Sequence, residues 1–354
     1  FLTRAFLGAL EQSGSVTAEA GWQPHHLALY RDDRLVAFAP GYIKGHSHGE
    51  FIFDWAWADA YHRNGFQYYP KLLTGIPWSP VTGPRLLTAA GQTDRDALRR
   101  ALVDLAVEEC QKLGLSSWHC NFTETVEEQA LQRPDLLSRM DTQFHWFNQD
   151  YTSFEDFLGQ LRSRKRKQIR RERRQVREAG VEFEWKSGPE LSEEDVDFVY
   201  RCYLNTFQAH GNHAALQPGF FQLLSETLGD GLQVALAIRN GKKIGMSLFL
   251  SGGGRLYGRY WGCVESISGL HFEAAYYQGI AHCIAHGIQV FESGAQGEHK
   301  LSRGFVPTET RSYHWIGHEG FRQAIAEHLK REENWVGDYR DSLQSHIPFR
   351  REPT

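Results

Sequence analysis

The chain has 354 residues, of which 41% are hydrophobic and 13% aromatic, so it can fill substantial cores and does not have a disordered composition. Its formal net charge of −4 excludes a strong overall attraction for nucleic acid or anionic membrane, which would need a local basic patch instead. No run of about 18 apolar residues is present, so we expect no membrane span. The five cysteines are odd in number and form no CxxC pair, which fits a reducing, cytoplasmic environment better than a disulfide framework.

The first half of the chain has the pattern of an α+β domain. A turn-like polar segment separates the first two apolar runs, which predicts a hairpin. Apolar residues then recur at helical spacing up to Gly114, which predicts a helix that ends there. The predicted elements are strands at 27–30, 35–43 and 51–53, a helix at 93–113, a strand at 115–122, a helix at 124–132 and an aromatic strand at 143–151.

The most basic part of the chain, residues 162–177, holds ten Arg or Lys residues and a single acid, Glu172. We expect it to lie in one helix over 154–179 that joins the two halves. Such a helix could neutralise several phosphates of a tRNA. Two other interpretations stay open, a solvated helix whose charges are met by acids of the chain and a helix that contacts an anionic membrane. The candidate phosphate-binding residues are Arg164, Lys165, Arg166, Lys167 and Arg170.

The second half repeats the order of the first. Its helix at 192–209 should be capped by Ser192, with Asp195 three residues on. Asn240-Gly241 and the three glycines at 252–254 predict tight turns, so three strands should form an antiparallel meander. The predicted elements are a strand at 181–185, helices at 192–209 and 220–228, strands at 232–238, 244–250 and 256–261, a helix at 270–286 and a strand at 288–291. We therefore predict an α+β protein with two domains, 1–150 and 151–354, each a mixed, mainly antiparallel sheet flanked by helices.

Several motifs spread along the chain are typical of one family. They are FDWAWADAY (53–61), YPKL (69–72), PVTGPRLL (80–87), SRKRK (163–167), GRYWG (258–262), LHFE (270–273), YYQGI (276–280) and the stretch 291–305. With these motifs the sequence resembles the FemAB-like peptidoglycan biosynthesis/recognition proteins, which are predicted N-acyltransferases. The resemblance extends over about residues 20–320, nearly the whole chain.

The resemblance implies two tandem GNAT-like domains, of which we expect the second to be active. It implies transfer of an acyl or aminoacyl group to an amine by direct attack, without a covalent enzyme intermediate. The donor would be acyl-CoA or aminoacyl-tRNA, with no tightly bound cofactor, and the acceptor an amine on a peptide, peptidoglycan precursor or small metabolite. No clear GNAT pyrophosphate loop precedes Leu270, which weakens the case for acetyl-CoA. The alternative is a non-catalytic module that recognises a peptide, glycan or nucleic acid. The oligomeric state stays open.

The polar, glycine-rich stretch 292–305 is the leading candidate site, because it follows a predicted strand. Glu298 and His299 are candidate bases that would take the proton of the attacking amine. Arg259 is a charge inside a predicted strand, expected near Glu298, and is the third candidate catalytic residue. Glu273 and Glu292 are its candidate carboxylate partners. Lone His pairs lack a third ligand, so we expect no metal site. The candidate substrate-binding residues are Tyr260, Trp261, Glu273, Glu292, Gln296, Lys300 and Arg303 in the second half and Lys44, Asp54 and Lys71 in the first.

Overall fold

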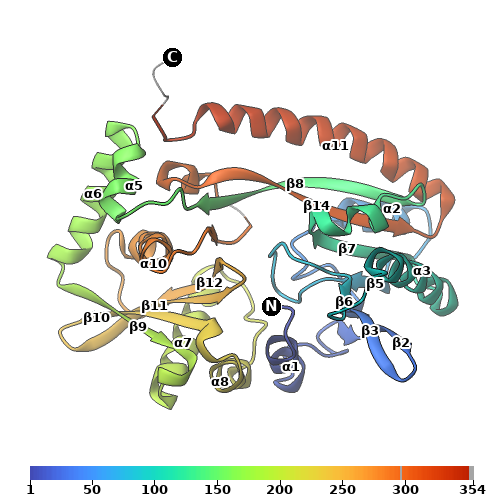
Figure 1. Ribbon diagram of the computed structural model, residues 1–354, viewed down its shortest axis with the longest axis horizontal. Helices are drawn as coiled ribbons and strands as arrows, with labels where there is room; N and C mark the ends of the chain where they lie inside the picture. The colour runs from blue at the N-terminus through green and yellow to red at the C-terminus, as the bar shows by residue number, and fades with distance from the viewer. Residues whose placement is uncertain (296, 351–354) are drawn as a thin grey trace.

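The computed structural model describes residues 1–295 and 297–350 (Figure 1). The strands are β1 (Trp22–Pro24), β2 (Leu27–Arg31), β3 (Arg34–Ala39), β4 (Gly41–Lys44), β5 (Lys71–Thr74), β6 (Leu87–Thr88), β7 (Ser117–Thr123), β8 (Leu136–Phe147), β9 (Val181–Ser187), β10 (Leu232–Arg239), β11 (Lys242–Gly252), β12 (Arg255–Cys263), β13 (Val290–Glu292) and β14 (Val306–Ile316). The α-helices are α1 (Arg4–Gln12), α2 (Trp55–Arg63), α3 (Arg95–Leu113), α4 (Glu128–Leu131), α5 (Phe154–Gln160), α6 (Ser163–Glu178), α7 (Glu193–Ala209), α8 (Pro218–Thr227), α9 (Leu270–Phe272), α10 (Gln278–Ala285) and α11 (Glu319–Ser345).

Among the described residues, eleven strands from both halves form one continuous mixed sheet in the order β1-β4-β5-β7-β14-β8-β13-β12-β11-β10-β9. The strands β9 to β12 are antiparallel neighbours, which confirms the predicted meander. β13 then pairs parallel with β12 and antiparallel with β8, so it links the meander to the first half. The predicted α+β class, with mainly antiparallel sheets flanked by helices, is confirmed.

The end of the chain returns to the first half, which the sequence did not reveal. β14 lies between β7 and β8 and pairs antiparallel with both. Figure 1 shows β8, β14 and α11 running across the two halves. At the other end, α1 packs against α8 and shares a hydrophobic cluster with it, with Phe6 and Leu10 beside Phe220. The boundary at residues 150 and 151 stays a prediction, because both termini pack across it.

Three local predictions are wrong. The expected strand at 35–43 is two strands, β3 and β4, which are separated at Pro40 and belong to different sheets. The expected helix over 154–179 is two helices, because Leu161 has an extended backbone (φ −83°, ψ 152°) and forms a β-bridge with Phe349. The expected strand at 51–53 is a turn, in which Phe51 takes a left-handed φ of 59°. The capping box expected at the start of the 192–209 helix is present, because the Ser192 hydroxyl accepts from the backbone N–H of Asp195 at 3.2 Å.

In the described part of the chain, no helix combines the length and the apolar character needed to cross a membrane.

Helix α7 packs directly onto the backbone of β12. A Cβ atom built at Gly262 would lie 2.0 Å from the carbonyl oxygen of Cys202 in α7. The hydroxyl of Thr206 donates to the carbonyl of Trp261 at 2.6 Å in the same contact. The glycine is therefore needed because the helix and the strand approach too closely for any side chain.

Gly262→Ala should lower the free energy of unfolding by about 1–3 kcal/mol or more, because α7 must move away from β12. Urea denaturation of the purified variant measures this. Gly252→Ala is the matched control in the neighbouring strand, since a Cβ there would meet nothing within 4 Å. Equal midpoints for the two variants would show that the close contact is absent.

Candidate functional site

The pairing of β12 with β13 ends early and opens the sheet. The two strands pair only from Arg255 and Val290 to Tyr257 and Glu292, whereas β12 continues to Cys263. Among the described residues, the backbone groups of β12 beyond Tyr257 therefore have no strand partner on that side. Such an unpaired strand edge is ready to hydrogen-bond a ligand. The strands β12 and β13 thus part at this point.

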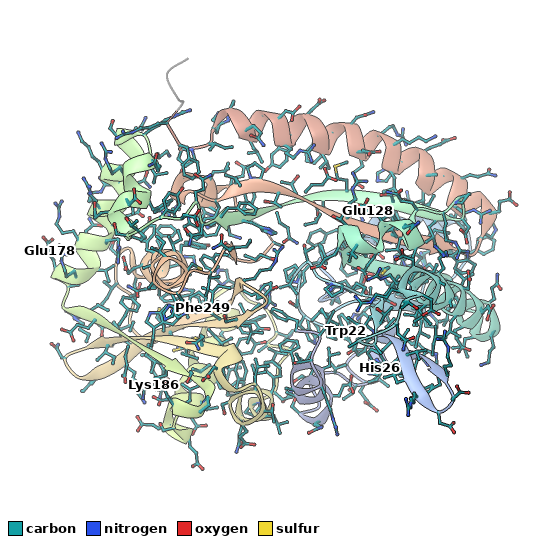
Figure 2. All side chains as sticks on the ribbon, viewed as in Figure 1. Trp22, His26, Glu128, Glu178, Lys186 and Phe249 are labelled. Atoms are coloured by element: carbon teal, nitrogen blue, oxygen red, sulfur yellow. The ribbon has the colours of Figure 1, made fainter. Side chains whose placement is uncertain are left out.

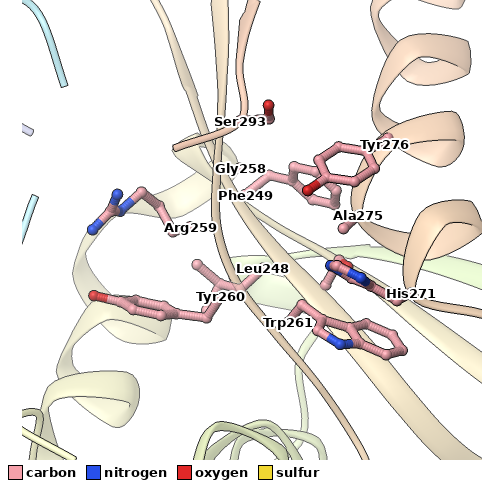
Figure 3. Close-up of a pocket in the computed structure, with 11 residues that line it drawn as sticks. Leu248, Phe249, Gly258, Arg259, Tyr260, Trp261, His271, Ala275, Tyr276 and Ser293 are labelled. Carbon is pink, nitrogen blue, oxygen red and sulfur yellow. The ribbon is translucent and has the colours of Figure 1, made fainter. Parts of the chain in front are cut away.

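A β-bulge places Arg259 at this opening. Leu248 of β11 pairs with Tyr260 and Phe249 pairs with Gly258, so Arg259 is the extra residue of β12. Bulges turn a side chain away from its regular direction and are frequent next to active sites. In Figure 3 the guanidinium of Arg259 points away from His271 and Tyr276.

A pocket of about 140 Å³ lies in the opening between β12 and β13 (Figure 3). It is lined by Ser247, Leu248, Phe249, Gly258, Arg259, Tyr260, Trp261, His271, Ala275, Tyr276 and Ser293. The side-chain oxygens of Ser247 and Ser293 are buried and have no hydrogen-bond partner in the described structure. Because an unpartnered buried hydroxyl costs free energy, these two oxygens favour a polar ligand in the pocket.

The helical wall of the pocket includes a π-helical segment, Glu273–Tyr277, between α9 and α10. Such segments are rare and frequent at functional sites. Burial lowers the pKa of His271 to about 4, with a smaller contribution from the nearby His299, so its imidazole is neutral at pH 7. Burial also lowers the pKa of His299, whose Nε2 lies 2.9 Å from the hydroxyl of Tyr276. Two imidazoles able to accept a proton therefore stand at or next to the pocket.

Arg259 contacts the first half rather than an acid. Its Nη2 donates to the carbonyl of Trp78. The two expected carboxylate partners are engaged elsewhere, since Glu273 pairs with Arg173 at 3.2 Å and Glu292 pairs with Arg255 at 2.7 Å. The sequence-based pairing of Arg259 with Glu273 or Glu292 is therefore wrong. Its guanidinium instead faces the junction between the two halves.

Tyr260 and Trp261 point to different sides of β12. Tyr260 packs its ring against Tyr203 and Phe221 in the core of the second half, as well as lining the pocket. The ring of Trp261 lies 5.4 Å from that of His271. Trp261 is therefore the aromatic residue on the imidazole side of the pocket.

Glu298 lies outside the lining of the pocket. It is exposed, and its Oε1 accepts a hydrogen bond of 2.6 Å from the hydroxyl of Tyr339 in α11. His299, the next residue, reaches the pocket wall through Tyr276. The role of Glu298 as a base stays a prediction, and Gln296 lies outside the described residues.

Lys300 and Arg303 are buried, so neither extends into solvent to clamp a ligand. The ammonium of Lys300 donates to the carbonyl of Gly294 at 2.8 Å, and burial lowers its pKa to about 7. The guanidinium of Arg303 donates to both carboxylate oxygens of Glu172 at 3.2 Å. The two cations hold the 298–303 turn in place, which leaves their expected substrate contacts a prediction.

Lys300→Met should stabilise the protein below neutral pH, and the gain should shrink as the pH rises. Between the lowered folded pKa of about 7 and the ordinary value of 10.5, the unfolded chain binds the proton more often, so the wild type gains stability as pH rises through that window. Urea denaturation of both proteins from pH 6 to pH 10 measures the difference. A constant difference over that range would contradict the burial of a neutral amine.

The three predicted residues of the first half meet in one buried cluster. Lys44 and Lys71 are register partners on β4 and β5 and are both fully buried. The ammonium of Lys71 donates to Glu50 at 2.8 Å and also to Asp54. The hydroxyl of Tyr68 donates to Asp54 at 2.7 Å. Glu50 was not among the predicted residues, because its position among Gly and His residues gave no sign of burial.

Burial and opposite charges together determine the protonation states of this cluster. Burial raises the pKa of Glu50 to about 7 and lowers that of Lys44 to about 7. Burial also opposes ionisation of Asp54, but the Lys71 ammonium holds the pKa of Asp54 well below its usual range. The cluster has no access to solvent in this conformation, so its expected contact with substrate stays a prediction.

Lys71→Met should cost about 3–5 kcal/mol of unfolding free energy, because it removes the cation that bonds both buried carboxylates, Glu50 and Asp54. Chemical denaturation at pH 7 measures the loss. Lys112→Met is the matched control, since Lys112 pairs with Glu109 while its side chain is 71% exposed. A loss for Lys71→Met as small as that of the control would show that the cluster is hydrated.

The candidate phosphate-binding residues all lie at the N-terminal end of α6. Lys165 donates to the hydroxyl of Ser302 at 2.7 Å, and Arg170 pairs with Glu155 at 2.5 Å. Arg164 and Lys167 are exposed. Their contact with tRNA stays a prediction. Among the described residues, no group of three or more His, Cys, Asp or Glu side chains is placed to hold a metal ion.

The fold and the pocket between parting strands define a tandem GNAT-like protein. The structure resembles FemX with a TM-score of 0.55 at 11% identity, over 89% of this chain and 93% of FemX. It resembles the C-terminal domain of a putative lysylphosphatidylglycerol synthetase from Agrobacterium fabrum with a TM-score of 0.57 at 9% identity, over 92% and 95%. L-PGS from Bacillus licheniformis gives a TM-score of 0.53 at 9% identity, over 95% and 96%. At these identities the likeness establishes the fold alone.

The chain belongs to the FemAB-like family, described as acting in peptidoglycan biosynthesis or recognition, and the match covers residues 1–351. No curated protein sequence matches it. The family's role is thus in the biosynthesis or the recognition of peptidoglycan.

Proposed function

We propose that this protein transfers an acyl or aminoacyl group to an amine in the pocket between β12 and β13. The observation that carries the proposal is the unpaired edge of β12 beside the bulge at Arg259. An acyl donor needs its carbonyl held by hydrogen-bond donors that also stabilise the oxyanion of the tetrahedral intermediate. Backbone N–H groups of the β12 edge and the hydroxyls of Ser247 and Ser293 are suited to that task.

The reaction needs a base and no nucleophile from the protein. The acceptor amine attacks the donor carbonyl, a C–N bond forms, and the bond to the sulfur or oxygen of the donor breaks. One proton leaves the amine nitrogen and one is taken up by the leaving group. His299 accepts the amine proton in this proposal, either directly or through the hydroxyl of Tyr276, and His271 is the alternative acceptor.

Arg259 binds the acceptor in this proposal. It forms no ion pair with an acid of the described residues, and its guanidinium faces the junction of the halves next to Trp78. A guanidinium with free N–H groups binds a carboxylate or phosphate strongly. Peptides and peptidoglycan precursors carry such groups, so an amine on one of them is the proposed acceptor. The donor is acyl-CoA or aminoacyl-tRNA, and the exposed cations of α6 favour a donor that carries phosphates.

The small pocket also supports a second candidate function. Its volume of about 140 Å³ lies below the roughly 300–1,000 Å³ of most small-molecule sites. A protein that only recognises a peptide, glycan or nucleic acid needs no room for a tetrahedral intermediate. Binding of peptidoglycan fragments without turnover of any donor would favour that role.

A donor screen tests the proposal, with acyl-CoAs and charged tRNAs offered to the purified protein and a peptidoglycan precursor as acceptor. Arg259→Ala should lower kcat/KM by about tenfold or more, because the acceptor loses its anchor. His299→Gln should lower kcat by a similar factor if it is the base. Glu298→Gln in the same assay decides whether that exposed carboxylate takes part.

Arg34→Ala is the matched control, because Arg34 is exposed on β3 in the small separate sheet. It should keep the full rate. Turnover that survives both Arg259→Ala and His299→Gln would contradict the assignment of the site. If no donor gives a product and the precursor still binds, the protein is a recognition module and not a catalyst.

A further inference from the structure

The one acid of the basic segment faces inward. Glu172 lies on the buried side of α6 together with Ile169 and Val176, whereas Arg164, Lys167 and Arg171 are exposed. A buried carboxylate is costly unless its oxygens are paired and hydrogen-bonded. The groups that bond Glu172 are therefore the groups that the buried side of α6 holds in place.

Glu172 bonds to the 298–303 turn and to the π-helical segment, whose Tyr276 lines the pocket. Its two oxygens each accept from Nη2 of Arg303 at 3.2 Å, and Oε2 also accepts from the hydroxyl of Tyr277. Gln168, one turn earlier, donates to Oε1 at 2.9 Å. The guanidinium of Arg303 lies 3.4 Å above the ring of Phe272, which keeps it flat against the helical wall.

Both partners of Glu172, Arg303 and Tyr277, are connected to the contact between Tyr276 and His299. Nη1 of Arg303 donates to the carbonyl of His299 at 2.8 Å, which fixes the 298–303 turn that carries this imidazole. Tyr277 is the last residue of the π-helical segment and follows Tyr276 directly. Tyr276 and His299 then meet at 2.9 Å. Glu172 is thus connected to His299 through Arg303 and to Tyr276 through Tyr277.

We propose that Glu172 is a positioning residue that keeps Tyr276 and His299 within hydrogen-bond distance of each other at the pocket wall. The basic helix α6 is thereby coupled to the pocket through its buried acid. The effect on turnover rests on the proposed function, whereas the effect on the His299 environment does not. Other links between α6 and the wall are less buried, such as Arg173 with Glu273, in which the arginine side chain is 31% exposed.

The first test is spectroscopic and needs no activity. Imidazole nitrogen and carbon shifts of His299, assigned with His299→Gln, are recorded for the wild type, Glu172→Gln and Tyr276→Phe. Tyr276→Phe removes the hydroxyl contact directly and so gives the reference for its loss. In Glu172→Gln the His299 signals should move toward that reference, because Arg303 and Tyr277 lose their shared anion.

Glu178→Gln is the matched control. Glu178 is the other acid of α6 and also pairs with an arginine, Arg174, at 3.8 Å. It lies on the outer face of the molecule (Figure 2). The His299 signals should not change in this variant. Wild-type shifts in Glu172→Gln, or equal changes in both variants, would overturn the proposal. If Glu172→Gln does not fold, Arg303→Lys makes the same test, since a lysine cannot bond Glu172 and the His299 carbonyl as the guanidinium does.

The second test is kinetic. With an active donor, Glu172→Gln should lower kcat by about tenfold while the KM for the donor stays within about twofold, because the base is misplaced but the donor site is kept. A fall in binding alone, with kcat unchanged, would contradict a positioning role. If no donor is turned over, the proposed function fails, but the shifts of His299 still decide the role of Glu172.

Discussion

The site depends on the early end of the pairing between β12 and β13. If β13 continued beside β12 beyond Glu292, the edge groups of residues 258–263 would be consumed in the sheet and the pocket would not exist. The bulge at Arg259 adds to this effect by turning its side chain out of the regular alternation. The helical wall then covers the opening with the neutral imidazole of His271. A polar, partly closed pocket at a strand edge follows from these few backbone features.

The rest of the molecule keeps this opening rigid. β14 is inserted between β7 and β8, and β8 pairs with β13, so both halves share one hydrogen-bonded sheet. The buried pair of Lys71 and Asp54 fixes the loop before α2, and a Cβ at Gly49 in that loop would clash with the ring of Trp78. The carbonyl of Trp78 in turn accepts from Arg259. The first half is thereby linked to the pocket, which fits a role in presenting the acceptor.

Sequence patterns predicted the local elements between residues 181 and 291 well, because alternation, glycine turns and the cap at Ser192 depend on near neighbours. They did not indicate where β14 pairs, since its partners β7 and β8 are more than 150 residues away in the chain. The charged residues pointed to the 298–303 turn, but the sequence did not show which of these side chains are buried and which are exposed. Lys300 and Arg303 proved internal, whereas Glu298 faces Tyr339 on the outside. Only tertiary packing decides which charge in a polar loop reaches a pocket.

The central claim is that the β12 edge holds the acyl donor. Backbone hydrogen–deuterium exchange with and without a saturating, non-hydrolysable donor analogue tests it most directly. Exchange should slow in peptides that cover 258–262 and 293–294, because the N–H groups there that have no strand partner bond the donor. Unchanged exchange in these peptides, with protection confined to α6 or to the first half, would contradict it.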